Sequence, residues 1–284
     1  MATKKTTGTE LAPAETFAVV NRFEGMDPEL LEELKDELAD LDSESGIDCR
    51  LIKIPAGGGL AYEIQGDNDD VSYAKEISGV IVFTHRMNGY WPGSYGTGDS
   101  GEDKIPLCSS MDGKTGLQRE TGEARHCDTC PLNQFGSADD GQGKGKACKN
   151  MRRLYLMLNN DPNIYLLTVP PTSIKDVNRH LVKIMGSGVP YTGMIVGLKL
   201  EKAVNVNGVA YSKVVLEKKG LLPPAASVRA QETRRQVKEQ YQNLAITMDD
   251  YIGVPQVDAA PAPANAENRD FVEAAADEDE GLPF

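Results

Sequence analysis

The sequence lacks any apolar run long enough to cross a membrane, and it lacks the hydrophobic stretch of a secretion signal after its polar first ten residues. Histidine is also scarce, with three in 284 residues, and none stands at ligand spacing from another. These absences argue against a membrane protein, a secreted protein and an enzyme with a histidine-based open zinc site. We therefore expect a soluble intracellular protein.

The charge is strongly acidic overall but unevenly distributed. The formal net charge is −13. Residues 1–48 carry 4 basic and 13 acidic groups, and residues 251–284 carry 1 basic and 8 acidic groups. Residues 49–250 therefore have a net charge of +3. A mildly basic body with acidic ends is compatible with a polyanionic ligand that competes with the protein's own acidic segments.

Four of the five cysteines lie close together, in the spacing C-x18-C-x2-C-x17-C, within a stretch that has few large apolar side chains. Such a stretch cannot pack a core of its own, and intracellular thiols stay reduced, so metal ligation is favoured over disulfides. A redox pair is the alternative for the central C-x-x-C. We predict one structural Zn²⁺, with four-thiolate ligation by Cys108, Cys127, Cys130 and Cys148. Cys49 is expected to be a structural thiol.

Hydrophobic periodicity predicts a mainly β protein with helices, of the α+β class. Five strands are expected, with a helix between the third and fourth, at residues 77–86, 151–158, 164–169, 194–202 and 209–218. This order is that of a five-stranded OB-fold barrel, and an unrelated α+β sheet is the alternative. The cysteine-rich residues 88–150 would then be a zinc-bearing insertion between strands 1 and 2, beside the binding groove. Ser173 and Asp176 predict the N-terminal cap of the helix, which should end at Gly186.

The remaining segments divide the chain into four parts. The expected boundaries are 1–48 for an acidic N-terminal segment with one helix, 49–222 for the OB-fold core, 223–250 for a C-terminal helix, and 251–284 for a disordered tether and acidic tip. Asp27 and Pro28 predict the start of the first helix. Residues 51–55 and 60–64 predict a hairpin around the glycines at 57–59.

Aromatic and basic residues are interleaved within and beside the insertion, as single-stranded nucleic acid would require for base stacking and phosphate contacts. On the second strand, Arg153 and Tyr155 lie opposite the leucine row, so both are expected to face outward if the leucines fill the barrel. The candidate DNA-binding residues are Tyr90, Trp91, Tyr95, Phe135, Lys144, Lys146, Lys149, Arg152, Arg153 and Tyr155.

The C-terminal tip combines four acids with an apolar end, and a terminal aromatic on a flexible tether indicates an anchor for a partner. The tip residues are Asp277, Glu278, Asp279, Glu280, Leu282, Pro283 and Phe284. These last eight residues resemble the C-terminal tip of bacterial single-stranded DNA-binding proteins, although Glu alternates with Asp here. With the zinc insertion, the body looks more like single-stranded DNA-binding proteins of phages or mobile elements. The resemblance implies a bacterial or phage-infected cytoplasm, and a tip that recruits replication, recombination and repair proteins and competes with DNA.

We therefore expect a non-catalytic protein that binds single-stranded DNA in replication or recombination, without a membrane, and either as a monomer or as an oligomer. One alternative is a zinc-dependent, nuclease-like enzyme acting on nucleic acid, for which Asp99, Glu102, Asp103 and Asp112 are the nearby acids. The other is an acidic adaptor that binds basic proteins and has no affinity for DNA.

Overall fold

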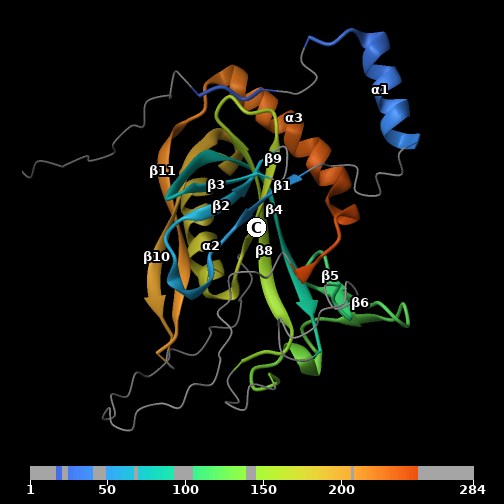
Figure 1. Cartoon of the computed structure of the whole chain (residues 1–284), viewed down its shortest axis with the longest axis vertical. Helices are drawn as coiled ribbons and strands as arrows, with labels where there is room; N and C mark the ends of the chain where they lie inside the picture. Colours follow the sequence, from blue (N-terminus) through green and yellow to red (C-terminus); the bar gives the residue numbers. More distant parts are fainter. Residues whose placement is uncertain are drawn as a thin grey trace, which may run out of the picture.

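The computed structural model describes residues 17–20, 25–40, 49–66, 70–92, 105–138, 145–205 and 208–248. Within these ranges the protein is mainly β with a few helices (Figure 1). The strands are β1 (Cys49–Lys53), β2 (Tyr62–Gln65), β3 (Val71–Ala74), β4 (Glu76–Tyr90), β5 (Cys108–Ser110), β6 (Thr115–Gln118), β7 (Ala124–His126), β8 (Lys149–Leu158), β9 (Ile164–Val169), β10 (Met194–Val204) and β11 (Ala210–Leu221). The α-helices are α1 (Pro28–Asp40), α2 (Pro171–Met185) and α3 (Pro224–Gln240).

All eleven strands belong to one hydrogen-bonded sheet, in the order β3-β2-β1-β9-β8-β4-β5-β6-β7, with β10 joined to β4 and β11 to β10. The 15-residue strand β4 is its branch point. Its first five residues pair with β10, most of its length pairs with β8, and its last three residues pair with β5. The cysteine-rich segment is therefore a direct extension of the main sheet rather than a separate unit.

The predicted order of three strands, a helix and two strands is confirmed by β4, β8, β9, α2, β10 and β11. The closed five-stranded barrel is not seen in the described residues, where the sheet stays open. Strand β9 pairs in parallel with β1, and β11 has β10 as its strand partner. The physical reason is that β1 occupies the edge of β9 that closure would need. The turn after β1 contacts β11 instead, through the Ser212 hydroxyl, which donates to the carbonyls of Pro55 and Gly59.

The predicted hairpin of β1 and β2 is confirmed, with the 3-10 turn η1 (Ala56–Gly58) between its strands. Gly57 and Gly58 have φ values of 69° and 80°, which disfavour residues with a Cβ atom. An ideal Cβ on Gly58 would also lie 3.2 Å from the Lys202 side chain on β10. The glycines thus let the turn pack against the β10–β11 hairpin.

One core lies between the sheet and α2, which presents Val177, Leu181 and Ile184 to it. The predicted cap is wrong, because α2 begins at Pro171 and Ser173 lies inside its first turn. The buried Ser173 hydroxyl accepts a hydrogen bond from the Val214 N–H at 2.9 Å, so it ties α2 to β11. The predicted helix end is confirmed, with Gly186 following the last residue of α2.

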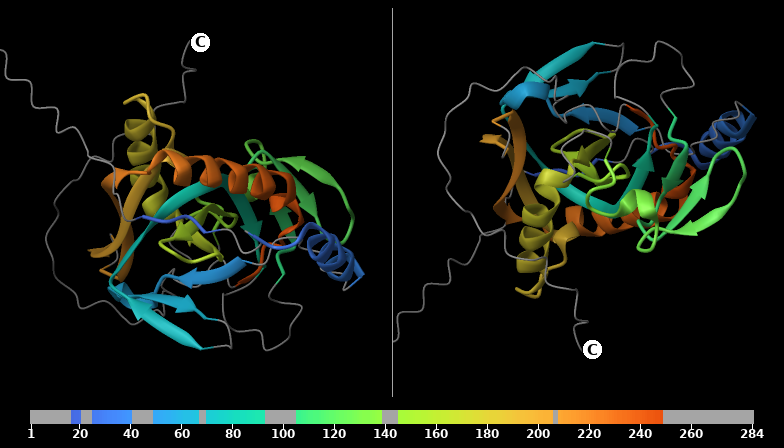
Figure 2. Two further views of the ribbon diagram at one scale, coloured as in Figure 1. Left: turned by 90° about the horizontal axis from the view of Figure 1, so that it is seen from above. Right: turned by 90° about the horizontal axis from the view of Figure 1, so that it is seen from below.

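A second core lies on the other face of β4 and β8, beneath α3 and residues 17–20 (Figures 1 and 2). Helix α3 contributes Ala226, Ala230 and Val237, and its Arg234 lies over the Phe83 ring. Both faces of these central strands are therefore covered along much of their length.

Helix α1 begins as predicted, since the Asp27 carboxylate accepts a hydrogen bond from the Glu29 N–H at 2.9 Å. Figures 1 and 2 show α1 apart from the sheet. Among the described helices, none combines the length and apolarity that a membrane crossing requires.

Candidate metal centre and nucleic-acid interface

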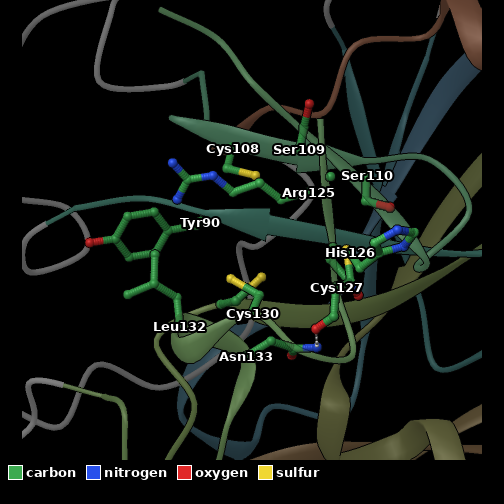
Figure 3. Close-up of a pocket in the computed structure, with 13 residues that line it drawn as sticks. Tyr90, Cys108, Ser109, Ser110, Arg125, His126, Cys127, Cys130, Leu132 and Asn133 are labelled. Carbon is green, nitrogen blue, oxygen red and sulfur yellow. Dashed lines mark hydrogen bonds between the residues drawn. The ribbon is translucent and has the colours of Figure 1, made fainter. Parts of the chain in front are cut away.

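The four clustered cysteines line a single pocket in the lobe formed by residues 105–138 and 145–148, which we call the thiol pocket (Figure 3). Cys108 opens β5 and pairs with Tyr90 at the end of β4. Cys127 follows β7, and Cys130 stands three residues later. Cys148 directly precedes β8. The pocket therefore joins the point where the chain leaves the main sheet to the point where it returns.

The lobe is built from short strands and turns that side chains hold in place. Strands β5, β6 and β7 form an antiparallel meander. In the turn between β5 and β6, the Asp112 carboxylate accepts hydrogen bonds from Ser110 Oγ and from the Lys114 and Thr115 N–H groups. Burial of Asp112 opposes its ionisation, but these hydrogen bonds outweigh burial and lower its pKa.

The segment around the C-x-x-C pair is held by amide side chains. Asn133 donates to the Cys127 carbonyl at 2.7 Å, and Gln134 donates to the Asp128 carbonyl at 2.7 Å. The Cys148 N–H donates to the Leu132 carbonyl at 2.8 Å, which fixes the last cysteine against this turn. Hydrogen bonds therefore hold these turns in a segment that has few large apolar residues.

The space between the sulfurs depends on a glycine. An ideal Cβ on Gly116 of β6 would lie 3.0 Å from Cys108 Sγ and 3.5 Å from Cys127 Sγ. A larger residue there would crowd both thiols. The absence of a side chain at position 116 thus leaves room where the sulfurs converge.

The thiols perturb one another. Burial, together with the neighbouring Cys127, Cys108 and Cys130, raises the pKa of Cys148 to about 12. Burial and the same kind of thiolate repulsion raise the pKa of Cys108, while Arg125 acts in the opposite direction. A cation in the pocket would favour the ionised forms of Cys108 and Cys148.

Within the described residues, no group of three or more His, Cys, Asp and Glu side chains is arranged so that it could hold a metal ion as it stands. The shared pocket nevertheless matches a tetrathiolate zinc site in donor chemistry. The position of each sulfur depends on one side-chain torsion, whereas the backbone already brings the four cysteines to one pocket. Zinc therefore stays a prediction.

Three candidate DNA-binding residues lie together beside the last cysteine. The Phe135 side chain is 78% exposed, and Lys146 Nζ lies 4.8 Å from its ring centroid. Lys149 Nζ donates to the Lys146 carbonyl at 3.3 Å. An exposed aromatic ring next to cationic side chains is therefore present on the lobe.

Tyr90 and Trp91 are half-buried and occupy different surroundings. Tyr90 lines the thiol pocket (Figure 3). Trp91 packs against the small core of Met87, Met151 and Ile246, and an ideal Cβ on Gly89 would lie 2.6 Å from its ring. Tyr95, Lys144 and the tip residues 277–284 lie outside the described residues.

The expectation that Arg153 and Tyr155 face outward is wrong, because both side chains are buried, at 1% and 0% exposure. They do lie opposite the leucine row, but the chain following α3 covers that face. Arg153 donates to the carbonyls of Leu244 and Ala245, at 3.3 and 2.5 Å. The Tyr155 hydroxyl lies 3.2 Å from His85 Nε2. Neither residue can reach a nucleic acid in this conformation.

Arg152 lies on the opposite face of β8 from Arg153 and Tyr155. Its neighbour Arg86 is not among the site residues predicted from the sequence. Arg152 stands opposite Arg86 in the β4–β8 ladder, and its Nη1 donates to Thr84 Oγ1 at 3.0 Å. Burial and the nearby Arg86 lower the pKa of Arg152. The alternation of Thr84, Arg86 and Asn88 along β4 was the available signal, since residues two apart share one face of a strand.

No protein family, curated protein or solved structure matches this chain.

Proposed function

We propose that this protein binds single-stranded DNA without catalysis and acts in DNA replication or recombination. The observation that supports this most directly is the exposed Phe135 ring of the lobe, with Lys146 Nζ 4.8 Å from its centroid and Lys149 nearby at the start of β8. An exposed ring can stack on any base, and adjacent lysines can contact phosphates, so the surface suits binding with little sequence preference.

One structural Zn²⁺ held by Cys108, Cys127, Cys130 and Cys148 is part of the proposal. When bound, the metal would stabilise the thiolate forms and supply folding energy to a lobe poor in apolar residues. The chain's own residues then orient the binding surface. In particular, the Cys148–Leu132 hydrogen bond holds the start of β8 against the turn that leads to Phe135.

The strand pairing supports an altered OB-type core. Strand β4 pairs with both β8 and β10, and α2 lies between β9 and β10 in the chain, as the OB order requires. In our interpretation, the β1–β2 hairpin replaces the direct pairing of the third and fifth strands. The lobe then stands at the loop between the first two strands, where OB-folds bind nucleic acid.

Fluorescence anisotropy with labelled oligo-dT at low and high salt tests the proposal. We expect tight binding at low salt, a steep loss with added salt, and an affinity about ten-fold lower for Phe135→Ala, since base–aromatic stacking contributes about 1–3 kcal/mol per base. The matched control is Leu117→Ala, which removes another exposed side chain (54%) from the same lobe and should leave the affinity unchanged. Absence of binding by the native protein at low salt would refute the proposal.

The tip at residues 277–284 is proposed to recruit replication and recombination proteins, with Phe284 entering an apolar pocket and the acids contacting a basic rim. Deleting Asp277–Phe284 should abolish partner pull-down and leave or strengthen DNA binding. If both measurements are unchanged, the tip has no such role.

A further inference from the structure

The face of β4 and β8 that borders the lobe carries two arginines at directly opposed positions. Arg86 and Arg152 are cross-strand partners in the antiparallel ladder. Like charges directly opposite each other on neighbouring strands destabilise a sheet. Among the described residues, no carboxylate forms an ion pair with either guanidinium. The pair is therefore a concentration of positive charge without a described protein counterion.

The Arg152 guanidinium is held in place but makes few hydrogen bonds. Thr84 Oγ1 accepts from its Nη1, and the same hydroxyl donates to the Arg153 carbonyl at 2.8 Å, so the acceptor is fixed to the backbone. Arg152 Nε is buried, and it has no hydrogen-bond partner within the described part of the chain. A guanidinium offers five donors, and only a small part of that capacity is used here.

A turn of the lobe packs against the side chain of Arg86. An ideal Cβ on Gly113, which has a φ of 72°, would lie 2.9 Å from Arg86 Cβ, so the turn at Gly113 packs on the arginine stem. The same turn is fastened to β4, because Asn88 Nδ2 donates to the Gly113 carbonyl at 3.3 Å and His85 Nδ1 lies 2.8 Å from the Met111 carbonyl. The pair thus lies where the lobe and the sheet meet.

We propose that Arg86 and Arg152 form a phosphate-binding pair that takes a phosphodiester of the nucleic-acid backbone at the junction of sheet and lobe. Two guanidiniums suit the several acceptor oxygens of a phosphate, and an anion between them removes their mutual repulsion. Arg152 lies four residues along β8 from Cys148, or roughly 13 Å at the usual rise of a strand. The proposal rests on the proposed function, and it extends the binding surface from Phe135 on the lobe onto the sheet.

The first test measures the salt dependence of oligo-dT binding for Arg86→Gln, Arg152→Gln and the double variant. Each lost phosphate contact should reduce the slope of log K against log salt by about 0.7 for single strands and weaken binding at low salt about ten-fold. Arg179→Gln on α2 is the control of equal charge change, since this arginine is exposed and paired with Asp176. A native slope in the double variant would overturn the pair as a phosphate site.

The second test separates this inference from the proposed function. Pyrophosphate should raise the melting temperature of the native protein, and the double variant should lose that rise. If the native protein fails to bind oligo-dT but keeps a pyrophosphate effect that depends on both arginines, the proposed function fails and the phosphate site stands. If DNA binds normally and the variants match the native protein in both assays, the phosphate site fails alone. Arg86→Gln changes an exposed side chain, so it remains informative if Arg152→Gln does not fold.

Discussion

Replacing Arg153 should lower the stability of the protein, because its buried guanidinium supports the chain that follows α3. Arg153→Met keeps the length of the side chain but removes the donors to Leu244 and Ala245. Leaving two carbonyls without these partners costs about 1–3 kcal/mol each, and removing a buried charge returns part of that cost. We expect a net loss of about 2–3 kcal/mol in the free energy of unfolding and a fall in Tm of about 4–10 °C.

Urea unfolding followed by circular dichroism gives the free energy, and limited proteolysis shows whether residues 241–248 become accessible. The matched control is Arg152→Met, the adjacent position on the opposite face of β8. This change removes one hydrogen bond to Thr84 but also relieves the repulsion by Arg86, so we expect a change within about 0.5 kcal/mol. Equal losses for the two variants, or native stability in Arg153→Met, would refute the structural role of Arg153.

Three further predictions concern the thiol pocket, His85 and Ser173. Purified protein should contain about one zinc per chain by atomic absorption, and Cys148→Ser should lose the metal and melt at a lower temperature. The control Cys49→Ser, which lies outside the pocket, should keep the metal. A metal-free native protein would contradict the zinc assignment. Burial lowers the pKa of His85 to about 4 from its ordinary 6.5, so the unfolded chain binds the proton first. The stability contributed by the neutral ring is present above pH 6.5, and the free energy of unfolding should fall by about 1.4 kcal/mol per pH unit as the pH is lowered from 6.5 to 4. His85→Gln should flatten this part of the pH profile measured by urea unfolding. An unchanged slope would count against the buried neutral histidine. Ser173→Ala should lower stability by about 1–3 kcal/mol by leaving the Val214 N–H unpaired. In the same urea assay, Ser78→Ala at an exposed position of β4 should be nearly neutral.

Sequence patterns predicted well those elements that depend on contacts between neighbouring residues of the chain. The third expected strand, residues 164–169, has the same bounds in the structure, because apolar β-branched and aromatic residues are enclosed there by turn residues. Asp27 acts as expected at the start of α1, since a capping carboxylate needs only its own backbone neighbours. The four cysteines of the predicted zinc site also line one pocket.

The misses involve contacts between distant parts of the chain. Nothing near β9 in the sequence indicates that β1 will pair with it in parallel and leave the sheet open. Alternation placed Arg153 and Tyr155 opposite the leucines, but it could not show that residues after α3 cover them. Ser173 resembled a cap because its true partner, the Val214 N–H, is 41 residues away.

The route of the chain through the sheet has a consequence for how the lobe can change. Gly89 on β4 pairs with Lys149 on β8, so the chain leaves and re-enters the sheet at neighbouring rungs of one ladder. In the described residues, the segment between Tyr90 and Lys149 is thus an elaborated hairpin tip. Lengthening such a connection adds only about 0.6 kcal/mol of closure entropy per doubling. A tight Asn-Gly turn that joins Gly89 to Lys149 should leave the β4–β8 hairpin in register. The lobe can therefore change in length while the β4–β8 ladder that carries it keeps its register.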